Sequence, residues 1–243
     1  MLRTTLALLL AFAGSSAFAD TIVVAPNAEA GSAGNATASP GTDAAEFQEV
    51  FGSGQFTGPI LITDIFLRTA VNTGPLSFSY SSFDITLSTT QAYPNDTGTH
   101  ALPSTTYANN VGPDATTVFD GPLSASSPGC TGSGPCPFDI EIALSTPFYF
   151  NPTVGRLLMD VVTSVSNGPT MGYFDGEMFS SYTGSTIASV SGPAGSPTGT
   201  LSPAGIIVEF DSAPEPASLA LLISGIALFT WLRRHPAFTQ SRT

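Results

Sequence analysis

Apolar and polar residues alternate strictly at two places in the chain. Residues 83–88 read Phe-Asp-Ile-Thr-Leu-Ser, and residues 138–144 read Phe-Asp-Ile-Glu-Ile-Ala-Leu. A period of two is that of a β-strand with one buried face. We therefore expect Phe83, Ile85 and Leu87 to face a core and the polar residue after each of them to face water.

Other apolar runs have the length of β-strands. The run 60–68, with Ile-Leu-Ile and Ile-Phe-Leu, is typical of a strand buried on both faces. Further runs, separated by loops rich in Gly and Pro, are Thr21–Ala25, Phe47–Phe51, Leu157–Val162, Met171–Phe174 and Gly205–Phe210. Together these give roughly ten short strands without an amphipathic helix, while residues 27–43 have the composition of a surface loop. The pattern predicts an all-β fold, an antiparallel β-sandwich of jelly-roll type.

The N-terminus has the features of a secretory signal peptide. Arg3 precedes an apolar run, Leu6–Ala13, and the small-residue pattern Ala17-Phe18-Ala19 follows. So short an apolar run cannot span a bilayer. We expect residues 1–19 to be removed, so that the exported chain begins at Asp20.

The C-terminus carries a second segment with membrane character. Pro214-Glu215-Pro216 stands before the apolar run Ala217–Leu232, and Arg233-Arg234 follows it. A helix of that length covers about 24 Å of a hydrocarbon core about 30 Å thick, and the arginine pair favours a cytoplasmic end. These properties divide the chain into an ectodomain, residues 20–213, and a tail, residues 214–243. They leave open whether the tail is a permanent anchor or a removable signal.

The string Ala-Pro-Glu-Pro-Ala-Ser at 213–218, the apolar run and the arginine pair together resemble the PEP-CTERM sorting domain of proteins exported by Gram-negative bacteria. The resemblance implies that a membrane processing enzyme, exosortase, recognises Pro214, Glu215 and Pro216, while Arg233 and Arg234 hold the tail inside. It also implies an inner-membrane intermediate facing the periplasm, then a place at the cell surface or in the extracellular matrix, linked to exopolysaccharide and biofilm formation.

The ectodomain in turn resembles a recurrent type found before such signals. The segments that carry this resemblance are Phe47–Phe51, Ile65–Arg68, Leu87–Thr90, Asn110–Gly112, and Thr146–Phe148 with Leu157–Val161. That type has no known activity, so the resemblance supports the sandwich and leaves the function open.

The charge of the ectodomain excludes several classes of function. Residues 20–213 hold 17 acids against Arg68 and Arg156, and the chain has no lysine. A surface this acidic repels phosphate backbones, which disfavours nucleic acid as a partner. Without lysine there is no Schiff-base or P-loop chemistry, and His100, the sole ectodomain histidine, cannot supply a two-histidine site.

Two cysteines lie close together in the ectodomain. Cys130 and Cys136 flank a turn-rich segment in a chain expected to leave the cytoplasm. The short flexible link allows a disulfide, which the oxidising compartment favours, and we expect it to clamp one loop.

Three sets of side chains are candidates for a functional site. Asp139 and Glu141 lie at i and i+2 of one strand, about 7 Å apart. That spacing could suit the carboxylates of a glycosidase, although acids between apolar residues are usually a solvated strand face. Loop acids that could hold a calcium ion are Asp114, Asp120, Asp160, Asp175 and Glu177. Tyrosines that could contact a sugar are Tyr80, Tyr93, Tyr107, Tyr149, Tyr173 and Tyr182.

The sequence thus predicts an exported, non-enzymatic β-sandwich with a structural or adhesive role at the cell surface or in an exopolysaccharide matrix. Its expected partners are an exosortase-type enzyme and the inner membrane. No cofactor is expected, with a structural calcium ion left open. The main alternative is a carbohydrate-binding module, with or without calcium, and a glycan hydrolase using Asp139 or Glu141 is the third hypothesis.

Overall fold

The computed structural model describes residues 21–38, 45–95, 99–132, 134–165 and 174–212. Backbone contacts group Thr21–Ser212 into one unit. Outside the described residues lie the predicted signal-peptide residues Ala17, Ala19 and Asp20 and the predicted sorting residues Pro214, Glu215, Pro216, Arg233 and Arg234. Within the described ranges, no helix has the length and apolar character needed to cross a bilayer.

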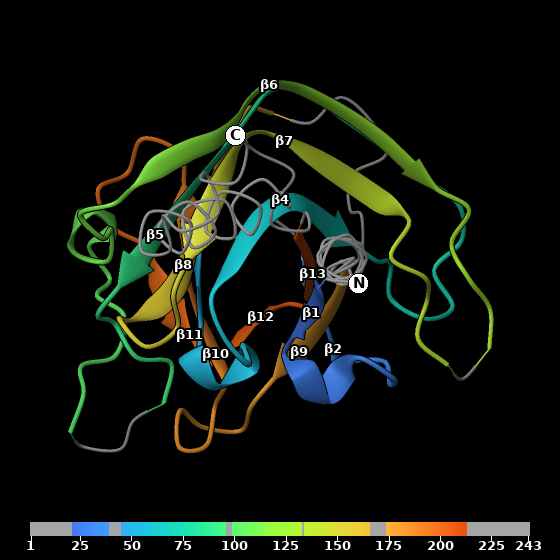
Figure 1. Cartoon of the computed structure of the whole chain (residues 1–243). Helices are drawn as coiled ribbons and strands as arrows, with labels where there is room; N and C mark the ends of the chain where they lie inside the picture. The colour runs from blue at the N-terminus through green and yellow to red at the C-terminus, as the bar shows by residue number, and fades with distance from the viewer. Residues whose placement is uncertain (1–20, 39–44, 96–98, 133, 166–173, 213–243) are drawn as a thin grey trace, which may run out of the picture. The chain divides into compact units, whose positions relative to one another are not determined.

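Strands dominate the described residues, and every pairing between them is antiparallel (Figure 1). A four-stranded sheet has the order β1 (Thr21–Ala25), β13 (Val208–Ser212), β4 (Ile60–Leu67) and β7 (Ile140–Phe150). A six-stranded sheet has the order β11 (Thr200–Ser202), β10 (Ile187–Pro193), β3 (Ala45–Phe51), β8 (Arg156–Thr163), β5 (Leu76–Thr90) and β6 (Thr116–Ser127). A small third sheet has the order β12 (Ala204–Ile206), β9 (Phe174–Met178) and β2 (Ala36–Ala38). Single turns of 3-10 helix are η1 (Asn27–Glu29), η2 (Ser53–Gln55) and η3 (Tyr107–Asn109).

The two larger sheets share one hydrophobic core. Phe83, Ile85 and Leu87 of β5 are buried in it, as the alternation predicted. The ring of Phe51, from the six-stranded sheet, meets that of Phe210, from the four-stranded sheet, edge to face with centroids 5.2 Å apart. The prediction of an all-β antiparallel fold is therefore confirmed.

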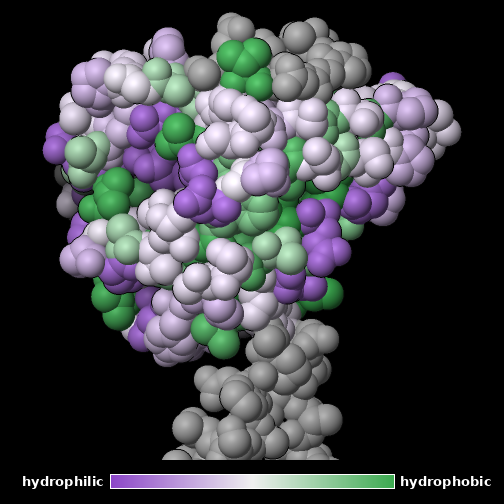
Figure 2. Space-filling model, turned by 90° about the horizontal axis from the view of Figure 1, so that it is seen from above, coloured by the Kyte–Doolittle hydropathy of each residue, from purple (hydrophilic) through white to green (hydrophobic). Residues whose placement is uncertain are grey.

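The outer surface has no comparable apolar concentration in the view of Figure 2. Pale residues of intermediate hydropathy cover most of the coloured surface there, with small groups of hydrophilic and hydrophobic residues between them. Large apolar side chains that are more than half exposed include Ile22, Tyr149 and Val154.

Several strand boundaries and one strand face differ from the predictions made from the sequence. Residues 205–210 form two strands, β12 and β13, which belong to different sheets. Residues 27–43, expected to be loop, include η1 and β2, because β9 supplies hydrogen-bond partners for β2. Ser88, expected in water, is 1% exposed, because the loop after η3 covers it and the Gly112 N–H donates to its hydroxyl at 3.1 Å.

Candidate functional site

A cavity of about 290 Å³ opens on the outer face of the six-stranded sheet, opposite the core. Its floor comes from β3 and β8, whose residues alternate between the two faces. Two loops build its rim, and they are tied together by hydrogen bonds from the Tyr107 N–H to the Pro197 carbonyl, 3.2 Å, and from the Gly199 N–H to the Thr105 carbonyl, 2.8 Å. The lining residues are Glu46, Gln48, Thr106, Tyr107, Ala108, Val111, Asp160, Ser196 and Pro197.

Gln48 organises the floor of this cavity, which we call the β3–β8 pocket. Its side chain is 1% exposed and all its polar atoms are engaged. The amide nitrogen donates to Asp160 Oδ2 at 2.9 Å and to the Tyr107 carbonyl at 3.3 Å. The amide oxygen accepts from Asn110 Nδ2 at 2.9 Å. These bonds fix the position of the Asp160 carboxylate relative to the rim.

Asp160 and Glu46 make the pocket acidic. Burial raises the pKa of Asp160, and its hydrogen bond from Gln48 only partly opposes this. Burial and the charge of Asp160 raise the pKa of Glu46. Burial, together with both carboxylates, raises the pKa of Tyr107 to about 12, so its hydroxyl stays protonated and donates to the Glu46 carbonyl at 3.1 Å. Each carboxylate would be stabilised by a donor that a ligand brought to it.

The acidic character continues across the outer face of the sheet. The register aligns Asp120, Asp84, Val162 and Glu46 on four neighbouring strands. With strands about 4.8 Å apart, this row extends roughly 14 Å from Glu46 to Asp120. The pKa of Asp84 is raised by burial and by Asp120, and lowered by a hydrogen bond from Ser82. The pocket is therefore one end of an acidic strip.

The five loop acids proposed as calcium ligands do not converge. Asp114 accepts from the Thr89 N–H at 2.7 Å, and Glu177 accepts from Asn35 Nδ2 at 2.6 Å. Asp120 and Asp160 belong to the acidic strip, and Asp175 is paired elsewhere. Among the described residues, no group of three or more Asp, Glu, His or Cys side chains is arranged to hold a metal ion.

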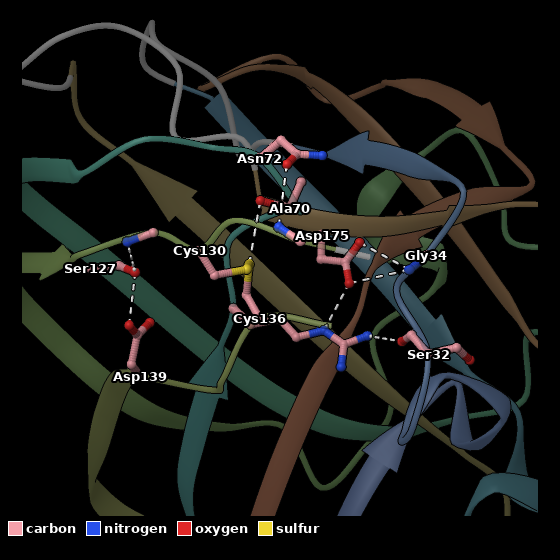
Figure 3. The surroundings of a disulfide bond; sticks show 12 residues. Ser32, Gly34, Ala70, Asn72, Ser127, Cys130, Cys136, Asp139 and Asp175 are labelled. Atoms are coloured by element: carbon pink, nitrogen blue, oxygen red, sulfur yellow. Dashed lines mark hydrogen bonds and ion pairs between the residues drawn. A yellow bond between two sulfur atoms is a disulfide. The ribbon is translucent and has the colours of Figure 1, made fainter. Parts of the chain in front are cut away.

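Asp175 forms a buried ion pair with Arg68, the residue that directly follows β4. Arg68 Nε donates to Asp175 Oδ2 at 2.8 Å, and both side chains are at most 2% exposed. Arg68 Nη2 also donates to the carbonyls of Glu29 and Ser32, at 3.0 and 2.7 Å. Figure 3 shows the other side of Asp175 turned toward Gly34, whose N–H donates to both carboxylate oxygens. The pair thus ties the 27–35 segment to the sheets, which is a structural role.

The disulfide expected from the sequence is present, with Cys130 and Cys136 joined at a Cα–Cα distance of 5.6 Å (Figure 3). Beside it, Asp139 accepts from the Ser127 hydroxyl at 2.8 Å. Glu141 is exposed on the outer face of the four-stranded sheet, opposite Phe66. Asp139 thus helps to hold the end of β6, and the pair predicted as a weak catalytic candidate is divided between a loop contact and a solvated strand face.

The candidate tyrosines have different surroundings. Tyr80 is in the core and Tyr107 is in the pocket wall, both buried. Tyr93 lies between the guanidinium of Arg156, 3.8 Å from its ring centroid, and the stacked ring of His100 at 4.6 Å. The remaining tyrosines are Tyr149, which is 56% exposed, Tyr182, which is half-buried, and Tyr173, which is outside the described residues.

Sequence reasoning missed Glu46 and Gln48 as site residues. Gln48 belongs to the run Phe47–Phe51, which predicts a strand, and Glu46 directly precedes that run. The signal that could have found them is the polar phase of the strand, at 46 and 48. Asp160 was named, but as a calcium ligand. Comparison with protein-family models, with curated proteins and with solved structures returned no match for this chain, so its function is inferred from the fold and the pocket.

Proposed function

We propose that this chain is an exported protein of the cell surface or extracellular matrix, with a structural or adhesive role linked to exopolysaccharide. The signal-peptide pattern at 1–19 and the three-part sequence at 214–243 support export and processing by an exosortase-type enzyme. The chain crosses between the two larger sheets from β3 to β4, from β4 to β5, from β6 to β7 and from β7 to β8, which supports a jelly-roll type of sandwich. The role we propose is binding and not catalysis.

A second feature fits attachment at one end of the domain. Thr21 and Ser212 are register partners, and the Thr21 N–H lies 3.3 Å from the Ser212 hydroxyl oxygen, to which it donates. The described unit therefore begins and ends at one place, on the β1–β13 pair. A domain of this kind can be tethered by its last strand.

Processing is tested by the intact mass of the protein recovered from its native host. We expect a chain that begins at Asp20 and has lost residues from its C-terminus, so that it ends before Thr243. A C-terminus at Thr243 in the surface or matrix fraction would refute processing. The same spectrum reports whether Cys130 and Cys136 are oxidised.

The β3–β8 pocket is the observation that favours saccharide binding as the way in which the domain acts. Its volume, about 290 Å³, is just below the usual range for ligand sites, about 300–1,000 Å³, and suits one sugar ring. Carboxylates accept hydrogen bonds from sugar hydroxyls, while Val111 and Pro197 offer apolar surface for ring carbons. Saccharide binding would link an exported sandwich directly to exopolysaccharide.

A blocking variant tests this role without changing charge. Ala108 is exposed at the pocket rim, so Ala108→Trp should fill the opening and abolish binding in a glycan screen of the full-length chain in mild detergent. Ala143→Trp, at an exposed position of the four-stranded sheet, is the matched control. If no glycan binds the wild-type chain, or if both variants bind equally well, the pocket is not a saccharide site.

A further inference from the structure

The chemistry of the pocket is more selective than a general affinity for sugars. The pocket holds two carboxylates, and no arginine or histidine is among its lining residues. Of the two arginines in the described chain, Arg68 is bound to Asp175 and Arg156 stacks on Tyr93. Within the part of the chain that the structure describes, no cationic side chain therefore neutralises Glu46 and Asp160.

One oxygen of the Asp160 side chain has no hydrogen-bond donor within the described part of the chain. Asp160 Oδ1 is buried and, among the described residues, has no hydrogen-bond partner, whereas Oδ2 accepts from Gln48. A buried carboxylate oxygen without a donor carries a desolvation cost, which a positive charge close to the carboxylate would offset. Because Gln48 is itself fixed by Asn110, the carboxylate cannot turn freely to find a donor elsewhere.

We propose that the β3–β8 pocket recognises the protonated amine of an amino sugar in a cationic polysaccharide. This inference rests on the proposed saccharide-binding function and names its ligand class. An ammonium group brings three donors and one positive charge, which match the two carboxylates of Asp160 and Glu46. A calcium ion would need six to eight oxygen ligands, more than these two side chains supply.

The acidic strip extends the same recognition along a polymer. Asp84 and Asp120 lie in register beyond the pocket, with Val162 between Asp84 and Glu46. A chain of amino sugars crossing the strands would place further amines over these acids. The pocket supplies the position of one ring, and the strip supplies electrostatic attraction for its neighbours.

The experiment compares two probes that differ only at nitrogen. Glucosamine oligomers and fully N-acetylated oligomers of equal length are titrated into the full-length chain in mild detergent, followed by calorimetry at low and moderate salt. We expect the amine form to bind at least about tenfold more tightly, because charge-assisted hydrogen bonds are lost on acetylation. Added salt should weaken the amine form more than the acetylated form.

Matched variants test whether the pocket carboxylates are responsible for binding the amine. Asp160→Asn and Glu46→Gln should each weaken amine binding about tenfold or more, while Glu141→Gln, which removes one charge from an exposed site on the other sheet, should leave it unchanged. Thermal unfolding of each variant shows that it is folded. Using two pocket variants keeps the test valid if one of them does not fold.

Four results would overturn the inference. Equal affinity for both oligomers would leave saccharide binding intact but remove the amine as its basis. If all three acid variants weakened amine binding equally, the oligomer would be attracted to the acidic protein in general and not to the pocket. Lysine oligomers that bind as tightly as glucosamine oligomers would point to a peptide ligand instead. Binding of neither sugar would refute the amine inference, and the glycan screen would then decide whether the pocket binds any saccharide.

Discussion

Replacing Arg68 by methionine should destabilise the folded domain by about 3 to 5 kcal/mol, because it leaves the Asp175 carboxylate buried without its cation. The Arg68 side chain is 1% exposed, and its guanidinium serves Asp175 and the carbonyls of Glu29 and Ser32. All of these acceptors would lose a donor at once. A typical domain has only about 5–15 kcal/mol of stability, so the loss is a large share of the total.

The assay is thermal and urea unfolding of the full-length chain. For a domain near this size, each kcal/mol shifts Tm by about 2–4 °C, so a fall of roughly 6–20 °C is expected. Arg156→Met is the matched control. Arg156 is partly buried and stacks on Tyr93, a contact of about 0.5–1 kcal/mol, so its loss should shift Tm by a few degrees at most.

A double-mutant cycle separates the ion pair from its neighbours. Asp175→Asn alone should also destabilise the fold, because Arg68 would then be buried without its counter-charge. The double variant should be less destabilised than the sum of the single variants, by at least about 1 kcal/mol. Additive losses, or a loss below about 1 kcal/mol for Arg68→Met, would refute the assignment of the pair as a structural tie.

Three further changes test other parts of the fold. Burial raises the pKa of Glu49 well above its ordinary value of about 4.3, so the folded chain keeps a proton that the unfolded chain releases, and stability falls as pH rises above that value. Glu49→Gln should flatten this fall in urea unfolding between about pH 4 and pH 8, and an unchanged slope would contradict it. Replacing Cys130 and Cys136 by serine should cost at most about 2–3 kcal/mol and leave the circular dichroism spectrum native, whereas loss of the β-signal would mean that the clamp is global. A Cβ on Gly112 would collide with backbone, so Gly112→Ala should cost about 1–3 kcal/mol in thermal unfolding, while Gly58→Ala, with open space around it, should be nearly neutral; equal effects would contradict the close approach.

The all-β class could be predicted because several of the longer strands carry their own signal. Where one face packs on the core, alternation survives in the sequence, as in Phe83, Ile85 and Leu87. Short strands such as β2 and β12 carry no such signal, because three residues cannot show a period and their pairing depends on β9, far away in the chain. The outer face of β5 was misjudged at Ser88 for a similar reason, since the covering loop is a tertiary feature.

The sequence alone could not reveal the pocket, because two adjacent polar residues of β3 have quite different environments in the fold. Gln48 and Glu49 have similar polarity, and a strand must send them to opposite faces. Glu49 faces the core at 0% exposure, where it accepts from the Ile206 N–H at 3.0 Å and uses space left by Gly205. Gln48 faces outward, yet it is 1% exposed because the loop carrying Asn110 folds over it. Polarity alone would assign both side chains to water. Their environments come from residues 62 and 157 positions away, so no window around β3 contains the information that makes one a core acid and the other the floor of the β3–β8 pocket.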